Sequence, residues 1–77
     1  MSLADQALAQ QDENAIASDI RVAGLPIVVR AADGEISLKG VVDTLIQKEL
    51  VHSIAQGIQG VKRVTTVELI VKEENKD

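Results

Sequence analysis

Few residues of this chain have the types and spacing that chemistry needs. His52 is the only histidine among 77 residues, and the chain contains no cysteine and no aromatic residue. One imidazole without further ligands at a recognisable spacing does not predict a metal site. Ser18, Ser37 and Ser53 show no nucleophile-elbow setting, and there is no glycine-rich phosphate loop. We therefore predict no catalytic residue, no cofactor and no metal, and not an enzyme.

One glycine pair has the spacing of a nucleic-acid-binding loop. Gly57-Ile58-Gln59-Gly60 is a G-x-x-G sequence, which in KH domains clamps a nucleic-acid backbone. Here Ile58 belongs to an apolar helical stripe, and only Lys62 and Arg63 follow it closely. Residues 16–71 carry six acidic and six basic side chains, so no basic field gathers phosphates. We predict that nucleic acid is not a partner.

Length and composition allow one small domain. Chains of this size bury only about 60% of their unfolded surface, which excludes a second core. The net charge of −4 arises at the two ends of the chain. No segment approaches the roughly 20 apolar residues of a membrane span, and no signal peptide is visible at the start. A signal peptide that had been removed would leave the same sequence, so the compartment stays open.

The N-terminal third predicts a leader and one helix. Residues 1–11 are rich in Ala and Gln and offer little to bury, so we expect a flexible or frayed leader. Asp12 suits a helix N-cap, and an apolar stripe at helical spacing follows over about three turns. The stripe consists of Ile16, Ile20 and Ala23. Gly24 and Pro26 end this helix.

Residues 27–31 and 35–42 predict two antiparallel strands joined at Asp33-Gly34, a strong signal for a two-residue hairpin turn. This turn sets a register with three pairs on the core face. The pairs are Ala31 with Ile36, Val29 with Leu38, and Ile27 with Gly40. The missing side chain of Gly40 would let a helix approach the sheet closely.

The C-terminal half predicts a second helix and a third strand. Thr44 and Gln47 match a capping box, and an apolar stripe follows. The stripe consists of Ile46, Leu50, Val51, Ile54, Ala55 and Ile58. On the polar side we expect Lys48 and His52 to be solvated, and we expect Gly60 to end the helix, followed by Val61 as an apolar lid. Residues 64–71 are β-branched and form the last strand.

The order helix, strand, strand, helix, strand predicts an α+β fold. We expect an αββαβ two-layer sandwich, in which two helices cover one face of a small three-stranded mixed sheet. Three aliphatic side chains are then left outside the core. Val28 and Val41 lie on the open sheet face, and Leu45 lies at the start of the second helix. They are the candidate interaction surface, although single exposed aliphatic residues are common in proteins without such a role.

The succession of glycine and aliphatic residues resembles the BON domain, named for bacterial osmotically inducible and nodulation proteins. The matching pattern is Gly34-x-Ile36-x-Leu38-x-Gly40-x-Val42, then Val51-x-x-Ile54-Ala55-x-x-Ile58-x-Gly60-Val61-x-x-Val64. The resemblance covers residues 12–71, and residues 72–77 are a charged C-terminal tail. The family implies structural roles for Gly34, Gly40, Gly60 and Val61.

The resemblance also implies a function. BON domains are proposed to attach bacterial proteins to phospholipid or other envelope components, which implies a non-catalytic module in the periplasm or cell envelope, with a link to osmotic stress. A cytoplasmic location is expected if the native protein lacks a signal peptide. The alternative is a protein interaction or self-association module within a larger multidomain protein.

Two departures from the family pattern lead to further expectations. The family usually has several more residues between the first helix and the first strand than the four residues 23–26 provide. Glu68 stands where members generally place an apolar residue, and a bulge near Thr65-Thr66 would restore the pattern.

Overall fold

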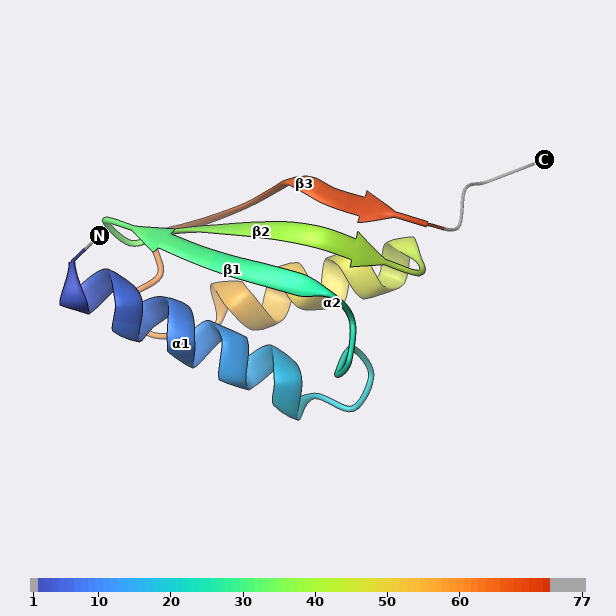
Figure 1. Ribbon diagram of the computed structural model, residues 1–77, viewed down its shortest axis with the longest axis horizontal. Helices are drawn as coiled ribbons and strands as arrows, with labels where there is room; N and C mark the ends of the chain where they lie inside the picture. Colours follow the sequence, from blue (N-terminus) through green and yellow to red (C-terminus); the bar gives the residue numbers. More distant parts are fainter. Residues whose placement is uncertain (1, 73–77) are drawn as a thin grey trace.

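The computed structural model describes residues 2–72, and it confirms the predicted αββαβ two-layer sandwich. The elements are α1 (Leu3–Ser18), β1 (Ile27–Ala32), β2 (Glu35–Val42), α2 (Leu45–Gln56) and β3 (Arg63–Val71). Both helices lie on the same side of the sheet (Figure 1). The opposite face of the sheet is therefore left open. The predicted charged tail lies outside the described residues except for Lys72.

Strand β2 is the middle strand of the sheet, antiparallel to β1 and parallel to β3. Asp33 and Gly34 both have positive φ, at 52° and 85°, as a two-residue hairpin turn of this kind requires. The turn gives the predicted register, in which Ala31 faces Ile36 and Ile27 faces Gly40. The local turn residues thus determine which side of each strand meets the helices.

Strand β3 contains the bulge that the sequence predicted. Ser37 pairs with Thr65, while Lys39 pairs with Glu68, so one extra residue of β3 is accommodated opposite Leu38. The extra residue returns Leu69 to the core and leaves Glu68 on the exposed side. The bulge lies one residue further along the chain than expected, at positions 66–67.

The start of the first helix differs from the expectation. Helix α1 begins at Leu3, and residues 3–11, expected as a leader, form its first half. Ser2 is the N-cap: its Oγ accepts a hydrogen bond from Asp5 N at 3.0 Å, and its N–H donates to Asp5 Oδ2 at 3.4 Å. This is a capping box, a local signal that the weak apolar pattern obscured. The expected cap, Asp12, instead lies inside the helix.

The end of the first helix is also earlier than expected. Helix α1 ends at Ser18, so the connection to β1 has eight residues, 19–26, and the expectation of a shortened loop is wrong. Asp19 Oδ1 accepts a hydrogen bond from Arg21 N at 3.0 Å, an Asx turn that competes with helix continuation. Ile20, expected in the apolar stripe, is 91% exposed, and Val22 is buried in its place.

The core between the two layers is aliphatic. It consists of Ile16, Val22, Ala31, Ile36, Leu38, Val42, Val51, Ala55, Val64 and Leu69. Two expectations for α2 are wrong: Ile46 is exposed rather than part of the buried stripe, and Gly60 does not cap the helix. The cap is Gly57, and Gly60 has φ of 102° in the turn that leads to β3.

Candidate functional site

The family-pattern glycines hold backbone segments together. A Cβ atom at Gly40 would lie 2.0 Å from Pro26 O, and Gly40 has φ of 146°. The backbone before β1, and not a helix as expected, therefore requires glycine here. Gly34 O accepts a hydrogen bond from Lys62 N at 2.7 Å, which joins the hairpin turn to the start of β3. Val61 is half-buried against the core.

The open sheet face has one apolar and one polar end. At the apolar end Val28 is 51% exposed and Val41 is 36% exposed, and Ile70, which pairs with Val41, is 59% exposed. At the other end Arg63 Nη2 forms an ion pair with Glu35 Oε2 at 2.8 Å. Sequence reasoning missed Ile70, because its side is set by the bulge in β3. A flat apolar patch of this kind can contact another surface.

Leu45 is exposed as expected, but the structure places it on a different surface from Val28 and Val41. It lines a hollow between α2 and β3, which we call the α2–β3 hollow, with a volume of about 340 Å³. The hollow is lined by Leu45, Lys48, Glu49, His52, Ser53 and Thr66. Lys48 and His52, expected to be solvated, are half-buried here. The three candidate residues therefore do not form one patch.

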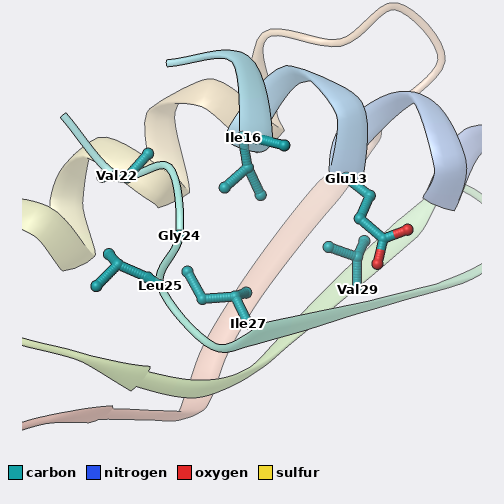
Figure 2. A pocket seen from close by; sticks show the side chains of 8 residues that line it. Glu13, Ile16, Val22, Gly24, Leu25, Ile27 and Val29 are labelled. Carbon is teal, nitrogen blue, oxygen red and sulfur yellow. The ribbon is translucent and has the colours of Figure 1, made fainter. Parts of the chain in front are cut away.

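A second, smaller hollow lies between α1, the 19–26 connection and β1. It has a volume of about 80 Å³ and is lined mostly by apolar side chains, with Glu13 on α1 as the charged member (Figure 2). Ile16, Ile27 and Val29 point into the space between helix and strand. Small-ligand sites usually have about 300–1,000 Å³. This hollow therefore fits no more than a short aliphatic group.

Asp12 is the most unusual titratable group of the described residues. Its side chain is 0% exposed, and neither carboxylate oxygen has a hydrogen-bond partner. Burial raises the pKa of Asp12 to about 6, from an ordinary value of 3.8. The buried side chain of Asp12 faces the aliphatic core. Sequence reasoning missed this position because it treated Asp12 as a helix cap.

Other chemical signals do not converge in the described part of the chain. Among residues 2–72, no group of three or more His, Cys, Asp or Glu side chains is arranged to hold a metal ion. The G-x-x-G residues 57–60 follow α2 and lead into β3, so they do not join two helices as a KH loop does. No helix within residues 2–72 is long and apolar enough to cross a membrane.

The element order, the mixed sheet and the single helical layer define a small α+β sandwich whose second sheet face is free for contact. The family model described as BON domain matches residues 4–73, and the chain therefore belongs to the BON domain family. This is a family of non-catalytic binding modules that is generally linked to the cell envelope or to membranes. The match begins within the stretch that the sequence predicted as a leader. No curated protein matches the chain.

Proposed function

We propose that this domain attaches the protein that carries it to a bacterial envelope component, with phospholipid as the primary candidate. The observation that carries the proposal is the family match over residues 4–73. The free sheet face supports it, because Val28, Val41 and Ile70 offer exposed aliphatic contact area. A location in the periplasm or envelope and a role in osmotic stress belong to the same proposal, and fractionation of the native host tests the location.

Vesicle co-sedimentation tests the lipid proposal. Phosphatidylethanolamine vesicles are compared with vesicles that also contain phosphatidylglycerol, each at low and at high salt. Because residues 16–71 are balanced in charge, we expect binding that depends little on anionic lipid and little on salt. If the protein stays in the supernatant with every vesicle composition and salt concentration, phospholipid is not its partner.

A second candidate function is protein interaction or self-association, and the apolar end of the open sheet face favours it. Apolar patches of this kind mark contact sites between proteins as well as between proteins and membranes. Light scattering over a range of protein concentrations tests self-association, with Ile70→Ser as the variant that removes the most exposed member of the patch. A mass that stays monomeric at every concentration counts against self-association.

A further inference from the structure

We propose that the α2–β3 hollow binds a zwitterionic phosphodiester that carries a primary ammonium group, the chemistry of the phosphatidylethanolamine headgroup. The lipid as the source of this group rests on the proposed function, but the hollow itself is argued from its own residues. Its lining combines one ammonium group, one carboxylate, one imidazole and two hydroxyl groups. Each can contact one part of such a ligand.

Two elements build the hollow. Leu45, Lys48, Glu49 and His52 are spaced by three, four and seven residues, so they share one face of α2. Val51, on another face of α2, is buried in the core. The second wall comes from β3, where Thr66 is half-buried beside the lining residues of α2. Thr66 lies two residues after the buried Val64, so the alternation of the strand puts both side chains on the helix-facing side.

The polar side chains of the hollow are available to a ligand. Within residues 2–72, no ion pair engages Lys48 or Glu49. In the same part of the chain, no hydrogen bond to another protein group engages the side chains of His52, Ser53 or Thr66. Lys48, His52 and the two hydroxyl groups can all donate to phosphate oxygens. Glu49 can only accept, and it needs a donor.

The charge of the hollow selects a zwitterion over a simple anion. A phosphate bound by Lys48 would be repelled by the neighbouring Glu49, unless the ligand also presents a cation to that carboxylate. A phosphodiester with a primary ammonium group satisfies both charges at once. Leu45 adds an apolar contact for the carbon atoms next to the phosphate. The volume of about 340 Å³ falls in the usual range for small-ligand sites.

An NMR titration of the 77-residue chain locates the site. Amide shifts are followed with glycerophosphoethanolamine, glycerophosphocholine and inorganic phosphate as three separate probes. We expect saturable shifts at residues 45–53 and at Thr66 with the first probe. Glycerophosphocholine should bind several-fold more weakly, because its methyl groups remove the donors to Glu49, and phosphate should be the weakest. Shifts confined to the open sheet face, or equal binding of all three probes, would overturn the assignment.

Variants that each remove one charge test which part of the ligand Lys48 and Glu49 contact. Lys48→Gln should weaken glycerophosphoethanolamine binding about tenfold, the loss of one charge-assisted contact. Glu49→Gln should reduce its affinity to that of glycerophosphocholine, and it should leave glycerophosphocholine binding unchanged. Lys39→Gln, on the open sheet face, is the matched control and should behave as the unmodified protein. Equal losses in Lys39→Gln and Lys48→Gln would contradict the site. Unchanged amide shifts elsewhere show that each variant is folded.

Vesicles distinguish failure of this site from failure of the proposed function. If the unmodified protein and Lys48→Gln bind phosphatidylethanolamine vesicles equally, the membrane function stands and the hollow is not its headgroup site. If soluble glycerophosphoethanolamine binds in the hollow but vesicles do not, the site stands with a free phosphodiester as its ligand, and the membrane function fails. If neither the soluble probe nor vesicles bind, both proposals are wrong.

Discussion

Asp12 should make the domain more stable at mildly acidic pH than at neutral pH. The folded protein binds a proton at Asp12 more tightly than the unfolded chain does, since burial raises the pKa from 3.8 to about 6. The stability gained from protonation is fully present at pH values below the unfolded-chain pKa of 3.8 and is lost as pH rises through 6. At about 1.4 kcal/mol per pH unit, the loss is about 3 kcal/mol. This loss is a large part of the total free energy of unfolding of a domain of this size, because proteins have about 0.05–0.15 kcal/mol of stability per residue.

Urea unfolding followed by far-UV circular dichroism measures this effect, because the chain has no aromatic residue for fluorescence. The unmodified protein is compared with Asp12→Asn, which keeps the shape but does not titrate, and with Asp12→Leu. We expect the free energy of unfolding of the unmodified protein to fall by about 2.4 kcal/mol between pH 4 and pH 7, since part of the total change lies below pH 4. Asp12→Leu should be more stable than the unmodified protein at pH 7, since it buries no charge.

The comparison with Asp12→Asn isolates the effect from other carboxyl groups. The pKa of Asp19 is lowered to about 2 by hydrogen bonds from Arg21, so Asp19 loses its contribution only at lower pH. That change is common to all three proteins and cancels in the difference. Parallel stability profiles of the unmodified protein and Asp12→Asn between pH 4 and 7 would refute the reasoning, because Asp12 would then not be buried as a carboxylate in solution.

Three further changes test the packing and the open surface. Gly40→Ala should destabilise the domain by more than about 3 kcal/mol, because its Cβ would collide with Pro26 O. Gly57→Ala is the control, because a Cβ there meets only ordinary contacts and should be neutral. Thermal melting compares the two variants, and equal melting temperatures would contradict the close approach of Gly40 to Pro26. Ser2→Ala should lower the free energy of unfolding by about 1 kcal/mol, because it removes the N-cap of α1. Urea unfolding measures this change, and an unchanged unfolding midpoint would mean that the cap is not formed in solution. Ile70→Ser should change the free energy of unfolding by no more than about 0.5 kcal/mol, because the side chain is exposed. It should weaken any contact made by the open sheet face, which vesicle co-sedimentation and light scattering measure. A large loss of stability would show that this side chain is packed.

The parts of the fold that depend on local signals could be predicted from the sequence. Asp33-Gly34 determined the hairpin and its register, and Thr44 with Gln47 correctly marked the start of α2. The first helix was placed incorrectly because its central core-facing position is Asp12, a residue that pattern analysis assigns to a surface or a cap. Burial of that carboxylate is a tertiary effect, so hydrophobic periodicity alone does not reveal it.

The candidate site was less predictable than the fold. Leu45, Lys48 and His52 could be placed on α2, but the hollow also needs Thr66 of β3 beside them. A bulge near that position was predicted from the misplaced Glu68. Which residues of β3 lie beside Leu45, Lys48 and His52 depends on how α2 crosses β3, and this is set by the whole core rather than by local residues.

We expect the buried carboxylate of Asp12 and the proposed ligand site to act independently. Helix α1 packs mainly on β1, at one edge of the sheet, and less on α2, whereas β3 forms the other edge (Figure 1). The hollow lies between α2 and β3. Sites with no shared contacts usually contribute additively to stability. A ligand in the hollow should therefore raise the stability of the unmodified protein and of Asp12→Leu by the same amount. Unequal gains would mean that α1 and the α2–β3 hollow are coupled, and the penalty at Asp12 would then be part of how this domain responds to its ligand.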